Sequence, residues 1–352
     1  MPRFPFTFTR RKAVAAVVVL LVGGAVCFFF LRGTRLTRER EWSSQSADVG
    51  PILYTPDGKT LISGGADPVR LWDPATGRPK GSLSTYGASA TRLAISPAGN
   101  ILGCTRFRRT RGQPDQQTVE FWDLATGNRI TSIDAPVIAI AFSPTNPIVA
   151  TATYAPASTG VTLWSLPTIT RAATLPPIPN FGGGLAFSPD GKFLAVGEIG
   201  AVELFDVKTL ASIRTFTAPP SGYCGTLAFS ADGQTLAAVA SITAPAVSAA
   251  LCTWDVATAR PKLQVDFGHS ARDASFSADG KTLAVHLTWQ VFAPSQRIDV
   301  YDVQRGRRTA SLSIRKPYTW SLALSPDAKH LAVGFLPLTY TVPAQIGVWR
   351  ID

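Results

Sequence analysis

The chain has 352 residues, of which 45% are hydrophobic and 16% are charged, so it can bury a large core and is not a mainly disordered protein. Its 29 glycines and 27 prolines follow no Gly-X-Y period, which excludes collagen, and four cysteines are too few for a disulfide scaffold. Much of the formal net charge of +11 comes from residues 1–41 and from a cluster at 106–111, so the basic balance is no argument for a nucleic-acid-binding surface.

Residues 13–31 form one apolar segment, AVAAVVVLLVGGAVCFFFL, without a charged side chain. As an α-helix it would be about 28 Å long, which matches the hydrocarbon core of a bilayer. A cleaved signal peptide is the alternative, but the apolar run continues beyond the small residues Gly23, Gly24 and Ala25 at which cleavage would occur. The sequence therefore predicts a basic tail over 1–12, an uncleaved transmembrane helix over 13–31 and a short linker over 32–37.

The orientation of this span is not decided by the positive-inside rule, because lysine and arginine together number four on each flank. A single span behind a short basic tail usually leaves the tail in the cytoplasm. We therefore expect a single-pass membrane protein whose C-terminal part lies on the extracytoplasmic side.

From residue 50 onward one pattern recurs seven times. Each unit carries a turn signal like Thr55-Pro56-Asp57-Gly58, and successive signals are 41–48 residues apart. Proline presets φ, aspartate can bond its own backbone and glycine accepts positive φ. An apolar run follows, and then an aromatic marker, usually with aspartate after it: Trp72-Asp73, Trp122-Asp123, Trp164, Phe205-Asp206, Trp254-Asp255, Tyr301-Asp302 and Trp349. Each unit therefore predicts four short strands.

A repeat of this length and content is typical of a propeller blade. The aromatic-Asp dipeptides and the period resemble those of the WD-repeat proteins over about residues 50–352. The resemblance implies an all-β, seven-bladed β-propeller of four-stranded blades, preceded here by one N-terminal transmembrane helix. The Gly-His pair usual before the first strand occurs once, as Gly268-His269, so the polar network of regular members is not carried over. We expect a divergent, bacterial-type set of repeats.

The first strands alternate large and small side chains, which lets blades pack face to face, and the aromatic markers are expected to be core residues. The seventh unit ends at Asp352, after its third strand. The polar segment 36–46 can supply the missing outer strand and remove the open edges, so the propeller is predicted over 38–352 with a closing strand at about 36–46. The alternative is an unclosed last blade, with 36–46 as a linker.

Strands alternate in direction within a blade. The Pro-Asp-Gly turns and the turns after the markers therefore share one face, the turn face, while the other loops share the loop face. Since residue 36 would enter the ring on the turn face, close behind residue 31, the turn face is predicted to look at the membrane. The longest loops, near 105–118, 152–160, 240–250, 286–297 and 334–346, lie on the loop face.

These loops carry arginines and aromatic rings, the residue types that anchor protein interfaces. The candidate partner-binding residues are Arg106, Phe107, Arg108, Arg109, Arg111, Tyr154, Trp289, Phe292 and Tyr340. The alternative is that the rings cap the blade ends and that the arginines form a solvated loop tip.

The sequence contains no recognisable catalytic, phosphate-binding or metal-binding motif. The three histidines have no metal-ligand spacing, and neither a nucleophile elbow nor a phosphate-binding loop occurs. We therefore predict no catalytic, cofactor-binding or metal-binding residues and no cofactor.

The sequence predicts a membrane-anchored, monomeric scaffold that is not an enzyme and that binds protein partners through its membrane-distal loop face. Residues 13–31 are its contact with the membrane, and nucleic acid is not an expected partner. The alternatives are a propeller enzyme or small-ligand sensor that uses the central channel, and a structural envelope component.

Overall fold

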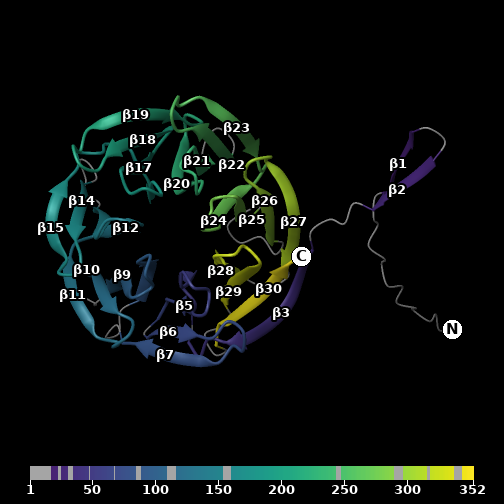
Figure 1. The fold of residues 1–352 in the computed structure, drawn as a ribbon. Helices are drawn as coiled ribbons and strands as arrows, with labels where there is room; N and C mark the ends of the chain where they lie inside the picture. Colours follow the sequence, from purple (N-terminus) through teal and green to yellow (C-terminus); the bar gives the residue numbers. More distant parts are fainter. Residues whose placement is uncertain are drawn as a thin grey trace.

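The computed structural model describes residues 17–22, 25–30, 35–46, 48–66, 68–84, 89–108, 116–153, 160–242, 247–288, 296–314, 318–336 and 343–352. Within these ranges the chain forms 30 β-strands and no helix. All but two of these strands lie in seven antiparallel four-stranded sheets, arranged as blades around a common axis (Figure 1).

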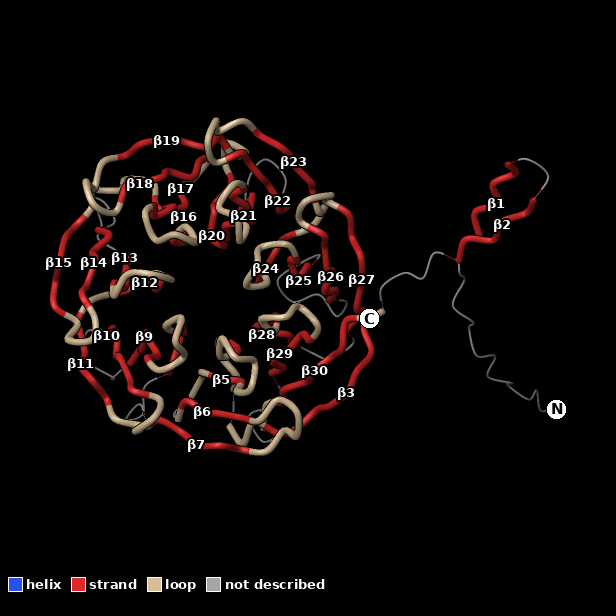
Figure 2. Tube along the Cα trace, in the orientation of Figure 1, coloured by secondary structure: helices blue, strands red, loops and turns tan. Residues whose placement is uncertain are grey.

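Blade 1 consists of β4 (Ile52–Tyr54), β5 (Leu61–Ser63), β6 (Val69–Trp72) and β7 (Pro79–Leu83). Blade 2 consists of β8 (Ser89–Ile95), β9 (Ile101–Arg108), β10 (Gln116–Asp123) and β11 (Arg129–Asp134). Blade 3 consists of β12 (Val137–Phe142), β13 (Ile148–Thr153), β14 (Gly160–Ser165) and β15 (Thr170–Thr174). Blade 4 consists of β16 (Phe181–Phe187), β17 (Phe193–Glu198), β18 (Ala201–Asp206) and β19 (Ser212–Thr217). Blade 5 consists of β20 (Gly222–Phe229), β21 (Thr235–Ile242), β22 (Ser248–Asp255) and β23 (Pro261–Asp266). Blade 6 consists of β24 (Ser270–Phe276), β25 (Thr282–Thr288), β26 (Gln296–Asp302) and β27 (Arg307–Ile314). Blade 7 consists of β28 (Tyr318–Leu324), β29 (His330–Leu336), β30 (Gln345–Ile351) and, as its outer strand, β3 (Leu36–Ser43). Figure 2 shows the first strands near the axis and the fourth strands on the rim. The all-β, seven-bladed prediction is confirmed.

The repeated turn between the first and second strands is fixed by side-chain hydrogen bonds. In blade 1 the Thr55 hydroxyl donates to Asp57 Oδ1 at 2.6 Å, and the backbone N–H of Lys59 donates to the same oxygen at 3.0 Å. The same hydroxyl-to-carboxylate bond recurs at Ser188, Ser230, Ser277 and Ser325. Glycine supplies the positive φ that ends the turn, as at Gly58 (φ 69°), which is the conformation that glycine adopts without steric penalty.

The core lies between neighbouring blades and is built around the aromatic markers. Trp72, Trp122, Phe205, Trp254, Tyr301 and Trp349 are all buried in the third strands of their blades. Trp164 is half-buried, and its indole N–H donates to Thr151 Oγ1 at 2.8 Å. At the seam between blades 4 and 5 the rings of Phe216 and Trp254 lie 5.9 Å apart, which illustrates how a marker packs on the preceding blade.

The ring is closed by β3, the segment for which the sequence predicts an outer strand. It pairs antiparallel with β30, from Leu36 opposite Ile351 to Ser43 opposite Gln345. The pairing continues at both ends, where the Asp352 N–H donates to Arg35 O at 2.9 Å and the Ser44 N–H donates to Ala344 O at 2.8 Å. The two ends of the described propeller thus share one sheet, with the C-terminus at the rim (Figure 1).

The segment predicted as a transmembrane helix has a different local structure. β1 (Val17–Val22) pairs antiparallel with β2 (Ala25–Phe30), and the rest of 13–31 lies outside the described residues. Valine and phenylalanine favour strands, which explains why this sequence can pair as a hairpin. Among the residues that the structure describes, no helix is long and apolar enough to cross a membrane. The helix over 13–31 is therefore not confirmed.

Candidate binding surfaces

Arg106, at the end of β9, is turned inward rather than toward solvent. Its guanidinium pairs with Glu120 Oε1, and Arg129 Nη1 approaches the same oxygen at 2.8 Å. The Arg106 side chain is 10% exposed and that of Glu120 is 1% exposed. In the β9–β10 register Glu120 lies opposite Cys104, so Arg106 is its diagonal neighbour on one sheet face. A buried carboxylate needs a cationic partner, so the Arg106 guanidinium stabilises the interior of blade 2 and is not exposed for contact with a binding partner.

The other predicted loop residues are only partly placed by the structure. Phe107 is half-buried and Arg108 is exposed at the loop-face end of β9. The remaining candidates lie outside the described residues: Arg109, Arg111, Tyr154, Trp289, Phe292 and Tyr340.

A cavity of about 390 Å³ lies on the axis of the ring, between the first strands of blades 1, 2, 6 and 7. Its lining is Pro51, Ile52, Thr91, Arg92, Leu93, Arg272, Asp273, Ala274, Ser275, Trp320, Ser321 and Leu322. First strands run from the loop face to the turn face, and most of these residues lie in the middle of their strands. The cavity therefore lies inside the central channel, with Thr91, Arg272 and Trp320 on its loop-face side. It contains residues that the loop-based sequence prediction missed.

The charged groups of this channel cavity are arranged in a defined way. The Arg272 guanidinium lies 4.6 Å from the centre of the Trp320 ring, and Arg92 on β8 is exposed in the same cavity. Asp273 Oδ2 accepts the Leu322 N–H at 2.8 Å and Oδ1 accepts the Ala274 N–H at 2.9 Å. Burial raises the pKa of Asp273 to about 6, although these N–H donors and the two arginines act in the opposite direction.

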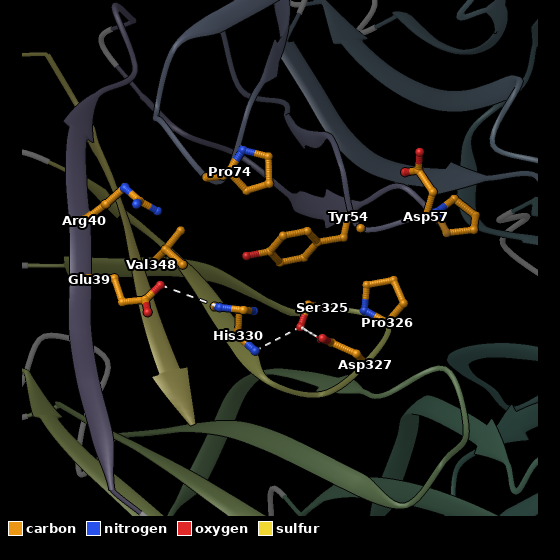
Figure 3. A pocket seen from close by; sticks show the side chains of 13 residues that line it. Glu39, Arg40, Tyr54, Asp57, Pro74, Ser325, Pro326, Asp327, His330 and Val348 are labelled. Carbon is orange, nitrogen blue, oxygen red and sulfur yellow. Dashed lines mark hydrogen bonds and ion pairs between the residues drawn. The ribbon is translucent and has the colours of Figure 1, made fainter. Parts of the chain in front are cut away.

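A second cavity, of about 420 Å³, lies on the turn face at the closing seam between blades 7 and 1 (Figure 3). His330 Nε2 lies 3.6 Å from Glu39 Oε2, which connects the second strand of blade 7 to the closing strand. The Tyr54 ring projects between Pro74 and His330 (Figure 3), and its hydroxyl is buried without a hydrogen-bond partner among the described residues. Burial raises the pKa of Tyr54, so the phenol stays protonated. The lining of this cavity carries three carboxylates, Glu39, Asp57 and Asp327, against one arginine, Arg40, and His330.

The described residues of the two cavities include no metal-ligand cluster and no free thiol. In the described part of the chain no three His, Cys, Asp or Glu side chains are grouped as metal ligands. Cys104, Cys224 and Cys252 are buried and free, and burial raises the pKa of each thiol to about 12. Thiols that are protonated and shielded from solvent are poor nucleophiles.

Comparison with known proteins finds sequence relatives for part of the chain, while no family model matches it. The chain is 28% identical over 156 residues to the WD repeat-containing protein slp1 of Schizosaccharomyces pombe, covering 43% of this chain and 30% of that protein. It is 28% identical over 155 residues to the protein FIZZY-RELATED 3 of Arabidopsis thaliana, covering 43% and 31%. It is 26% identical over 156 residues to the B-type cell cycle switch protein ccs52B of Medicago truncatula, covering 43% and 30%. The chain thus aligns with less than a third of the length of each relative, and none of the three names describes an enzyme.

Among solved structures, the β-propeller domain of Cps50 (Swd1) from Myceliophteria thermophila is similar, with a TM-score of 0.70 and 18% identity over 90% of this chain and 100% of that chain. At that identity the likeness shows the fold alone. None of these organisms is a bacterium, so the comparisons give no support to a bacterial-type set of repeats. The partial sequence relatives and the seven four-stranded blades together support the WD-repeat β-propeller family for this chain.

Proposed function

We propose that this chain is a membrane-anchored scaffold whose protein partner binds the membrane-distal loop face. WD-repeat propellers generally act as protein-interaction scaffolds, and propellers of this kind bind protein partners. The observation that carries the proposal is that four blades expose an arginine or aromatic side chain in the loop-face half of a strand: Trp320, Arg272, Tyr223 and Arg108. Arginine and aromatic side chains are enriched among the residues that dominate binding energy.

The membrane part of the proposal rests on the sequence of residues 13–31 and on where the chain enters the ring. β3 begins at Leu36, opposite Ile351 on the turn face, so only a few residues separate the apolar segment from that face. A tail over 1–12, a span over 13–31, a linker over 32–37 and a propeller over 38–352 would then hold the turn face toward the bilayer. A monomer on the extracytoplasmic side is the corresponding arrangement in the cell.

Site-specific photo-crosslinking in the native cells tests the proposal. A photoreactive amino acid is placed at Arg108 on the loop face, or at the exposed Lys208 on the turn face as the matched control. We expect one defined protein adduct from position 108 and none from 208, and we expect replacement of 109–115 by a short Gly-Ser linker to remove it. Adducts that form equally from both faces would refute loop-face binding.

The membrane arrangement has its own test. An activity reporter that works only outside the cytoplasm, fused after Asp352, should be active. A stable but inactive fusion would place the propeller in the cytoplasm and refute the proposed side of the membrane.

A further inference from the structure

The first strands share a feature that turns selected side chains into the channel. In five blades the pairing between the first and second strands skips one residue, at the same distance before the repeated turn. The skipped residues are Thr91, Ile138, Gly225, Arg272 and Trp320. Blade 4 has a wider irregularity between Phe181 and Leu185. These are β-bulges, which re-aim a side chain locally.

A bulge is the means by which a propeller strand can present a side chain to the axis. In a regular strand the side chains alternate between the two sheet faces, and neighbouring blades cover both of these faces here. The exposure pattern agrees with this reasoning. Thr319 and Ser321 are buried on either side of Trp320, which is 45% exposed.

The bulge residues divide the channel wall into two unlike arcs. Blades 6 and 7 present Arg272 and Trp320, and blade 2 adds the exposed Arg92 directly after its bulge residue, Thr91. Blade 3 presents the aliphatic Ile138, blade 5 presents Gly225, and the irregular stretch of blade 4 also consists of glycines. One arc therefore carries the charged and aromatic groups, and the opposite arc carries only glycines and one aliphatic side chain.

The two arginines are available to an anion. Among the described residues neither Arg92 nor Arg272 has a hydrogen-bond or salt-bridge partner, although the charges of both lower the pKa of Asp273. Arg272 is held over Trp320, and stacking on an aromatic ring leaves the guanidinium edge free for bidentate contact with a carboxylate. Asp273 is the one acidic residue of the cavity lining, and its charge offsets only part of that of the two arginines.

We infer that the channel site formed by Arg92, Arg272 and Trp320 recognises an acidic peptide segment of the partner. A glutamate or aspartate carboxylate would bind between the two arginines, and a neighbouring apolar side chain would cover Trp320. The inference rests on the proposed scaffold function and gives its partner a chemical class. A cavity of about 390 Å³ accepts one or two side chains and leaves the main chain of the partner on the loop face, where Tyr223 is 41% exposed.

Unbiased peptide selection on the purified full chain tests this inference. Twelve-residue random peptides are displayed on phage, selected peptides are synthesised with a fluorescent label, and binding is measured by polarisation. We expect enrichment of Asp and Glu, and a loss of affinity of about tenfold to a hundredfold when the key acidic residue of the peptide is replaced by its amide. Arg272→Gln or Arg92→Gln should cause a similar loss with the acidic peptide and little change with its amide counterpart.

Arg260→Gln is the matched control, because Arg260 is an exposed arginine on the turn face. If all three variants have the same Tm as the wild-type protein, the fold is intact. If peptides are selected but bind Arg92→Gln and Arg272→Gln as tightly as wild type, the channel inference is overturned while the scaffold function stands. If only free glutamate or citrate binds, and binding requires the arginines, the peptide assignment is overturned in favour of a small carboxylate ligand. If neither peptides nor carboxylates bind, the inference is overturned and the scaffold proposal loses support as well.

Discussion

The contact between blades 4 and 5 predicts a severe effect of the substitution Gly197→Ala. Gly197 lies in β17, and a Cβ added there would come within 1.9 Å of the Cys224 carbonyl oxygen in β20. An ordinary C···O contact is about 3.3 Å or longer, so the two backbones would have to move apart by more than about 1 Å. Backbone cannot rotate away as a side chain can, and Cys224 is fixed by pairing with Ala240. We expect a loss of about 3 kcal/mol, the upper part of the range for overpacking, or a fall in Tm of roughly 5 °C for a domain of this size.

Gly81→Ala is the matched control, because a Cβ at Gly81 in the outer strand β7 meets nothing within 4 Å. Circular dichroism melting of both variants measures the difference. We expect Gly81→Ala to melt within about 2 °C of wild type, since an exposed strand glycine gains little from packing. Equal Tm values for Gly197→Ala and Gly81→Ala would refute the close approach of the two blades.

Three further predictions concern the turns and a carboxylate pair. Ala328 stands at φ 56° at a position where five of the other six repeated turns have glycine, so Ala328→Gly should raise stability by up to about 1 kcal/mol in a urea titration, and a decrease would contradict the strain argument. The Ser188 hydroxyl holds the pKa of Asp190 below its usual value of 3.8, so the stabilisation from this carboxylate is present above pH 3.8 and is lost as the pH falls through the lower folded-state pKa. Asp190→Asn should therefore lower the midpoint at pH 7 but not at pH 2, and an equal loss at both would argue against this linkage. Burial, and then hydrogen bonding and charge from Glu203, raise the pKa of Glu198 from 4.5 to about 7. The stability of the wild-type protein should therefore decrease as the pH rises from 4.5 to about 7. Glu198→Gln should be more stable than wild type at pH 8 and similar at pH 4, whereas a constant difference would exclude the shifted carboxyl.

The sequence predicted the fold well because each blade repeats its own local signals. The Ser/Thr-Asp-Gly turn is stabilised by bonds within five residues, as Thr55 and Asp57 show, so it can be recognised without tertiary information. The aromatic markers recur in the third strands and are mostly buried for the same periodic reason.

The binding surface was harder to predict because its residues depend on non-local pairing. Arg106 belongs to a conspicuous basic cluster, but its buried partner Glu120 is on the next strand and its role follows from the register. Arg272 and Trp320 are turned into the channel by bulges, which a sequence pattern does not mark. Their only signal is the replacement of small or aliphatic residues by arginine and tryptophan in first strands. At the N-terminus, the transmembrane helix over 13–31 stays a prediction, because only 17–22 and 25–30 of that segment are described.

Hydrogen exchange of the full chain, with and without the protein captured by crosslinking at position 108, tests loop-face binding most directly. The account predicts protection at the loop-face ends of the first strands, in 89–92, 222–225, 270–273 and 318–321, with no change at the repeated turns 55–60 and 188–193. Protection confined to the turn face, or to the closing seam at 36–43, would contradict it.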